Sequence, residues 1–171
     1  MPSGGALFRL GLVFTFAAVA GCGGTTFDGR VFANSELSFR FSAVPEDWHT
    51  LDSDGALLAF RDDTVPASIV VNGRCGKDGD DVPLESLTHH LFLQFSDRQI
   101  ESQNKISMDG REALHTSLLA KLDGVERRFE VFVLKKNGCV YDFVQVAPPS
   151  ASADGRRRFV TFVQGFSTIR P

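Results

Sequence analysis

The second half of the chain contains four stretches rich in apolar and β-branched residues, separated by short turn sequences. The dipeptides Asp109-Gly110, Asp123-Gly124 and Asn137-Gly138 suit two-residue hairpin turns. They predict four consecutive antiparallel strands, a meander, at 100–108, 111–122, 125–136 and 139–147. The third strand should be covered on both faces, because its apolar residues point both ways. Phe129, Val131 and Val133 face one side, whereas Glu130, Phe132 and Leu134 face the other.

Three shorter segments in the first half also have the pattern of strands. Leu37–Phe41 alternates Leu, Phe and Phe against Ser and Arg, which is the period of a half-buried strand. Ala56–Arg61 and Ala67–Asn72 are predicted to be two further strands, with a polar turn between them. Pro45 and Trp48 are expected in the loop that follows the first of these strands.

Two segments have the period of a helix. Within residues 83–95 the apolar positions recur at spacings of three and four, with Pro83 in the first turn. A second apolar stripe, predicted to be helical, follows Pro148-Pro149 and consists of Phe159, Phe162, Val163 and Phe166. About seven strands in an antiparallel sheet and two covering helices predict an α+β sandwich.

The amino terminus has the features of an export signal. Arg9 precedes an uncharged apolar run, Leu10–Ala20, that is too short to span a bilayer stably. The ending Val19-Ala20-Gly21-Cys22 resembles the bacterial lipobox. That resemblance implies a lipoprotein signal peptide over 1–21 and lipid attachment to Cys22. A secretory signal with an incidental cysteine, or an uncleaved anchor, is the alternative.

The resemblance to the lipobox predicts the domain organisation of the chain and the location of the protein. Residues 22–34, with the run Gly23-Gly24-Thr25-Thr26, are expected to be a lipidated cysteine and flexible tether, and 35–171 a single folded domain. The lipid would hold the protein at a membrane of the cell envelope without crossing it. Gly23 in place of Asp after the cysteine resembles the outer-membrane pattern, if the cell has two membranes.

The remaining cysteines form a possible pair. The chain has three cysteines, so a lipidated Cys22 leaves Cys75 and Cys139. We predict a disulfide between them, because an even remainder suits an oxidising compartment. Two buried free thiols are the alternative.

The order of elements resembles the PsbP-like fold, which is shared by the photosystem extrinsic protein PsbP and by bacterial DcrB-type envelope lipoproteins. The matching features are Leu37–Phe41 followed by Pro45-Glu46-Asp47-Trp48, an early helix from Pro83, the meander with Asp109-Gly110-Arg111-Glu112-Ala113, and a closing Phe-rich helix. The resemblance implies a non-catalytic binding or assembly-assisting domain with no cofactor.

Composition narrows the range of partners. The 171 residues carry a formal net charge of −3, which argues against nucleic acid as a partner. Arg156-Arg157-Arg158 is the one basic run and is interpreted as a solvated helix start. Sixteen Phe against one Tyr and one Trp indicate a core of large rings that need no hydrogen-bond partner.

Candidate catalytic residues are few. His115 and Ser117 share one face of a predicted strand, but no acid partner or GxSxG motif accompanies them. Asp78, Asp80 and Asp81 form an acidic loop whose spacing departs from the EF-hand pattern. The other histidines are His49, His89 and His90, and none has metal-ligand spacing.

These observations leave three functional hypotheses open. The first is a lipid-anchored envelope protein that binds another envelope protein or component. The second is a hydrolase or metal-dependent enzyme centred near His115 or the acidic loop. The third is a carrier that holds an apolar ligand in a groove between a helix and the sheet.

Overall fold

A computed structural model describes Met1 and residues 24–76 and 81–169. The predicted meander is confirmed. Its strands are β7 (Ser96–Met108), β8 (Arg111–Leu122), β9 (Val125–Lys136) and β10 (Cys139–Ala147). All three turn dipeptides adopt positive φ at both positions, which confirms the two-residue hairpins. β7 starts four residues earlier than predicted, and its pairing with β8 is irregular near Ile100.

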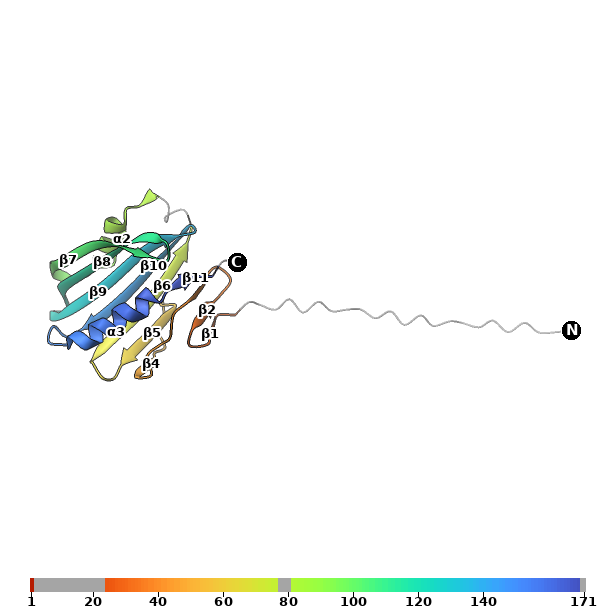
Figure 1. Cartoon of the computed structure of the whole chain (residues 1–171), viewed down its shortest axis with the longest axis horizontal. Coiled ribbons are helices and arrows are strands. Elements are labelled where there is room, and N and C mark those ends of the chain that lie inside the picture. The colour runs from red at the N-terminus through yellow and green to blue at the C-terminus, as the bar shows by residue number, and fades with distance from the viewer. Residues whose placement is uncertain (2–23, 77–80, 170–171) are drawn as a thin grey trace.

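The meander is part of a seven-stranded antiparallel sheet with the order β4-β5-β6-β10-β9-β8-β7 (Figure 1). The added strands are β4 (Trp48–Thr50), β5 (Leu58–Asp62) and β6 (Ala67–Cys75). The expectation of a loop at Trp48 was wrong, because Trp48 pairs with Asp62 across β4 and β5. Its buried ring lies against Phe162, so that tertiary packing holds the backbone extended there.

A second, four-stranded sheet has the order β1-β2-β3-β11. It contains β1 (Thr26–Phe27), β2 (Val31–Ala33), β3 (Ser38–Arg40) and β11 (Ser167–Thr168). The predicted tether over 22–34 is therefore wrong in its extent. Residues from Thr26 belong to the fold, because Phe32 is buried and stacks on Phe39 with ring centroids 4.8 Å apart.

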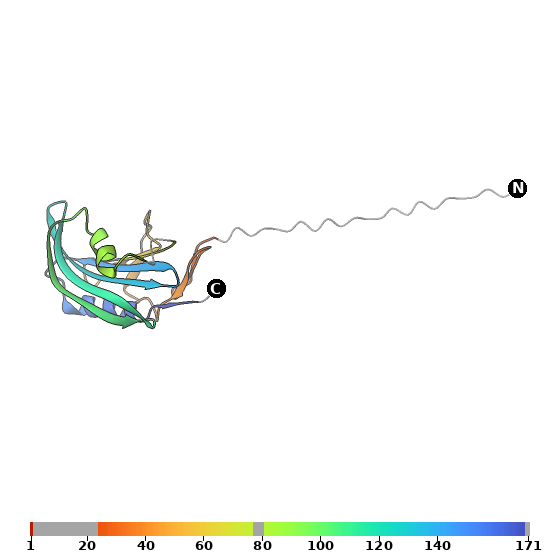
Figure 2. The same ribbon diagram turned by 90° about the horizontal axis from the view of Figure 1, so that it is seen from above.

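Two helices lie on opposite faces of the large sheet (Figure 2). α2 (Leu84–His90) is shorter than the predicted 83–95, because hydrogen bonds from Phe92 to His89 and from Phe95 to Phe92 tighten the chain into turns. α3 (Ala153–Gln164) carries the predicted Phe-rich stripe, and Phe166 follows just after its end.

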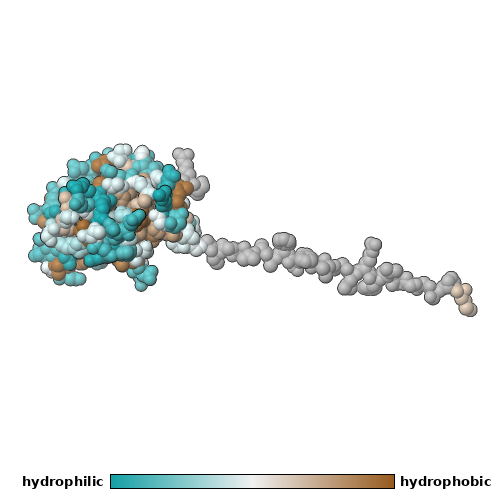
Figure 3. All heavy atoms as spheres, turned by 60° about the horizontal axis from the view of Figure 1, so that its bottom comes forward, coloured by the Kyte–Doolittle hydropathy of each residue, from teal (hydrophilic) through white to brown (hydrophobic). Residues whose placement is uncertain are grey.

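Each face of the sheet has its own apolar cluster, as the two-sided pattern of β9 predicted. Phe129, Val131 and Val133 pack towards α2, whereas Phe132 and Leu134 belong to the cluster that includes α3 and the small sheet. On the surface drawn in Figure 3, apolar residues form small areas interrupted by hydrophilic ones. Among the described residues, no helix combines the length and the apolar character that crossing a membrane would require.

Candidate functional site

A buried carboxylate, Glu130, is the centre of a polar cluster on the face of the sheet that carries α3. Strand alternation places it on the same face as Phe132, and its side chain is only 3% exposed. A charged group with so little access to water needs partners, because an unpaired charge in the interior is strongly disfavoured. Three side chains from two neighbouring elements supply them.

His115 and Ser117 of β8 bind the two oxygens of this carboxylate. His115 Nε2 lies 2.9 Å from Glu130 Oε2, and the Ser117 hydroxyl donates to Oε1 at 2.9 Å. The His115 ring stacks on Phe132 with centroids 4.1 Å apart, which fixes its plane. Because an ionised carboxylate only accepts, the His115 Nε2 must carry a proton in this arrangement.

Two arginines extend the cluster. Arg156, in the first half of α3, lies 3.5 Å from Glu130 Oε1. Arg128, two residues before Glu130, pairs with Glu101 of β7 at 2.8 Å. The other Glu101 oxygen lies 3.2 Å from the Ser117 hydroxyl, so that one serine proton faces two carboxylates.

A pocket of about 110 Å³ opens beside Glu130 at the start of α3. It has room for a few water molecules at about 30 Å³ each. Its polar lining includes Arg128, Glu130, Gln145 and Arg156. Arg128 Nε is buried, and no hydrogen-bond acceptor within the described part of the chain reaches it. A donor in this position is suited to a water molecule or a small polar ligand.

The geometry does not form a Ser–His–acid relay. In a relay the serine donates to the histidine, which in turn is held by the acid. Here both Ser117 and His115 bind Glu130 directly, so the serine proton is directed away from the imidazole. The arrangement holds a buried charge in place without activating a nucleophile.

The sequence analysis missed Glu130 as the acid partner of these residues. A signal was available, because a two-residue turn at 123–124 pairs residues whose numbers sum to 247. Ser117 and Glu130 meet this condition and are paired across β8 and β9. The position of this turn was therefore enough to identify the contact.

The fold itself is known from other proteins. No family model and no curated protein matches the sequence. The chain is similar in fold to cyanobacterial PsbP. The solution structure of that protein, CyanoP from Synechocystis sp. PCC 6803, superposes with a TM-score of 0.62 at 12% identity over 92% of this chain and 99% of that one. The PsbP-like fold expected from the sequence is confirmed, and identities this low support the fold alone.

Two further structures share the architecture. LpqN, involved in cell envelope biogenesis of Mycobacterium tuberculosis, has a TM-score of 0.53 at 14% identity over 79% of this chain and 86% of that one. PA94 from Pseudomonas aeruginosa, a putative regulator, has a TM-score of 0.51 at 14% identity over 87% and 99%. In each case the likeness spans most of both chains.

In this PsbP-like domain the interpretation of the basic run as solvated was wrong for two of its three arginines. Arg156 binds Glu130, and Arg158 pairs with the fully buried Asp62 at 2.6 Å. Burial opposes ionisation of Asp62, but hydrogen bonds from Thr64 and Val65 hold its pKa below the usual value. Of the three, Arg157 is the solvated one.

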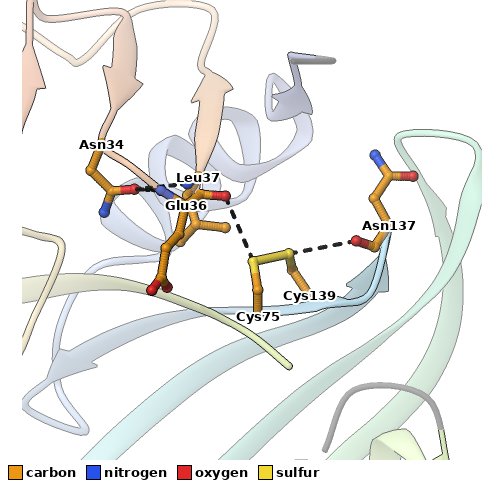
Figure 4. The surroundings of a disulfide bond; sticks show 6 residues. All are labelled: Asn34, Glu36, Leu37, Cys75, Asn137 and Cys139. Carbon is orange, nitrogen blue, oxygen red and sulfur yellow. Dashed lines mark hydrogen bonds between the residues drawn. A yellow bond between two sulfur atoms is a disulfide. The ribbon is translucent and has the colours of Figure 1, made fainter. Parts of the chain in front are cut away.

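The predicted disulfide joins Cys75 and Cys139, which are directly paired across β6 and β10 (Figure 4). The Cys75 sulfur also lies 3.8 Å from the carbonyl oxygen of Glu36, in the loop between β2 and β3. The bond thus ties two strands of the large sheet beside the β2–β3 loop of the small one.

The other predicted site residues do not gather. Cys22, Asp78 and Asp80 lie outside the described residues. His49 forms an exposed pair with Asp63 at 2.7 Å, on the opposite edge strand from β7. Within the described residues, no group of three or more His, Cys, Asp or Glu side chains could hold a metal ion.

Proposed function

We propose that the protein is a lipoprotein held at the cell envelope by lipid on Cys22, and that its PsbP-like domain acts by binding an envelope partner without catalysing a reaction. The observation that carries the non-catalytic part is the Glu130 cluster. Its serine and histidine are both engaged by one carboxylate, so neither is poised to attack a substrate.

Three features support the proposed location. The lipobox-like ending at Cys22 follows an apolar segment of signal-peptide length. The Cys75–Cys139 disulfide suits a compartment outside the reducing cytosol. One structural neighbour, LpqN, is described as involved in cell envelope biogenesis.

The proposed anchor would hold the domain close to the membrane. β1 begins at Thr26, four residues after Cys22. Four residues span at most about 14 Å when fully extended. The small sheet would therefore lie near the lipid headgroups. The turn between β8 and β9, at Asp123-Gly124, lies at the end of the meander that is farther from the small sheet (Figure 1).

The anchor is tested by replacing Cys22 with Ala in the full chain. We expect the variant to lose incorporation of labelled fatty acid and to leave the detergent-extractable membrane fraction. Thr25→Ala, three residues away, is the control and should behave as the wild type. Unchanged labelling and fractionation of Cys22→Ala would overturn the anchor.

The binding role is tested by crosslinking in intact cells. The wild type should give a discrete envelope adduct that Cys22→Ala loses, because the domain no longer resides at the partner's membrane. Ser117→Ala and His115→Ala should keep the adduct. A substrate turned over by the purified domain, with the rate falling by orders of magnitude in either of these variants at unchanged stability, would contradict the non-catalytic role.

A further inference from the structure

A groove of about 410 Å³ runs between α2 and two strands, the edge strand β7 and its neighbour β8. This volume lies within the range of small-molecule sites, roughly 300–1,000 Å³. The groove is on the opposite face of the sheet from the Glu130 cluster, since Leu118, which lines it, belongs to the apolar cluster of α2. Its lining is mostly apolar near one end and polar near the other.

The apolar end is formed by Phe92, Leu118 and Ile100. Phe92 and Leu118 are buried and form the floor. Ile100, on the edge strand, is 60% exposed and is one of few large apolar side chains left in solvent among the described residues. An exposed apolar side chain beside a buried apolar floor indicates a place where an apolar group is covered on binding.

A cation lies at the same end. Arg98 Nη1 donates to the carbonyl oxygen of Phe92 at 3.2 Å and lies 3.3 Å from His89 Nε2. These two contacts fix the guanidinium at the wall of the groove. In the part of the chain that the structure describes, no ion pair joins Arg98 to a carboxylate, whereas Arg128, Arg156 and Arg158 all have one.

Glu85 is the one carboxylate that lines the groove, and it lies one turn along α2 from His89. It also lines a neighbouring pocket together with Lys105. Lys105 is seven residues along β7 from Arg98, which corresponds to roughly 23 Å of strand. The groove lining thus carries one guanidinium, which lies beside Phe92, and one carboxylate.

We propose that this groove binds an amphipathic anion, an acyl chain with a terminal carboxylate. The carboxylate would pair with Arg98, and the chain would lie along Phe92, Leu118 and Ile100. A guanidinium fixed by neutral acceptors retains its charge for an anionic ligand, and its fork matches a carboxylate. This inference rests on the proposed binding role and gives the chemical class of the ligand.

The core of the other helix–sheet interface is closely packed. Beneath α3 the Phe side chains pack on each other, with Phe41 and Phe162 stacked at 4.1 Å and Phe166 close to Phe143 at 4.9 Å. That interface is filled by the protein's own rings. The apolar-ligand hypothesis from the sequence therefore applies to α2 instead of the Phe-rich helix.

The test uses residues 24–171, which contain all the helices and strands described above. Decanoate and its uncharged counterpart 1-decanol are titrated while amide chemical shifts are recorded by nuclear magnetic resonance. We expect decanoate to shift Thr88, Gln103 and Thr116, which line the groove, and to bind more tightly than decanol. Arg98→Gln should weaken decanoate binding by about tenfold or more and leave decanol unchanged, because a charge-assisted hydrogen bond is lost.

Two further variants make the result specific. Ile100→Ser should weaken both ligands by a similar factor, and it is expected to fold because its side chain is largely exposed. Arg61→Gln is the matched control and should change neither affinity. Arg61 is exposed on β5, and three strands, β6, β10 and β9, lie between β5 and β8.

Several outcomes would overturn the proposal. These are no binding of decanoate, equal binding by the wild type and Arg98→Gln, shifts that map outside the groove, or shifts that depend on protein concentration alone and so indicate a second copy of the chain. Because this fragment lacks Cys22, none of these outcomes bears on the anchor, which the Cys22→Ala experiment tests separately.

Discussion

The pairing of Arg158 with Asp62 gives the sharpest test of the packing between α3 and the sheet. The Asp62 carboxylate is fully buried and accepts hydrogen bonds from the Thr64 amide at 2.9 Å and the Val65 amide at 3.2 Å. Arg158 supplies the cation at 2.6 Å and also reaches Asp47 at 3.1 Å. Arg158→Ala leaves a buried carboxylate with hydrogen bonds but no counter-charge.

The expected loss is large for a single surface-facing helix position. Removing one partner of a buried ion pair costs about 3–5 kcal/mol. The local hydrogen bonds to Asp62 remain, and Arg158 is itself 29% exposed, so we expect a lower value. The free energy of unfolding should fall by about 2–3 kcal/mol, within the range of a disrupted buried network.

The measurement is urea unfolding followed by the fluorescence of Trp48, the one tryptophan in the chain. Trp48 is buried 5.1 Å from the Phe162 ring of α3, so its emission reports on this interface. Arg157→Ala is the matched control. Arg157 is 74% exposed and pairs with the exposed Asp154, so its loss should stay below about 0.5 kcal/mol. Equal losses in the two variants would refute the reasoning.

Three other perturbations follow from the structure. Replacing Cys75 and Cys139 with Ser should lower the free energy of unfolding by roughly 4 kcal/mol in urea, and a loss under about 1 kcal/mol would argue against the bond. Gly165→Ala would place a methyl 2.8 Å from the Ser42 backbone nitrogen, so the free energy of unfolding should fall by about 1–3 kcal/mol. The midpoint of thermal unfolding should fall with it, and an unchanged midpoint would contradict this contact. Burial raises the pKa of Asp142, so the ionised carboxylate lowers the stability of the fold at neutral pH, and this stability is regained as the pH falls through the raised pKa. Asp142→Asn should therefore have a higher free energy of unfolding than the wild type at pH 7, and the difference should shrink towards pH 3.

The sequence by itself determined the meander and its register. Asp or Asn followed by Gly takes the positive φ values of a tight hairpin with little strain, so each turn fixed where its flanking strands begin and end. The observed bounds of β8, β9 and β10 are the predicted ones. The cover over both faces of β9 also followed, because its apolar side chains alternate on two sides. The cysteine pair followed from counting, and the register of β6 with β10 then brought both residues together.

Only the tertiary structure decided the small sheet, the extent of α2 and the partners of the arginines. β1 and β2 are two and three residues long, and they are ordered by packing of Phe32 against Phe39 and by pairing with β3. The helical pattern after His90 is overridden where Phe92 and Phe95 turn in to contact Phe129. The basic run has the same composition whether solvated or paired. Which arginine meets a buried carboxylate depends on how α3 is rotated on the sheet, and that angle is set by long-range contacts that no local pattern records.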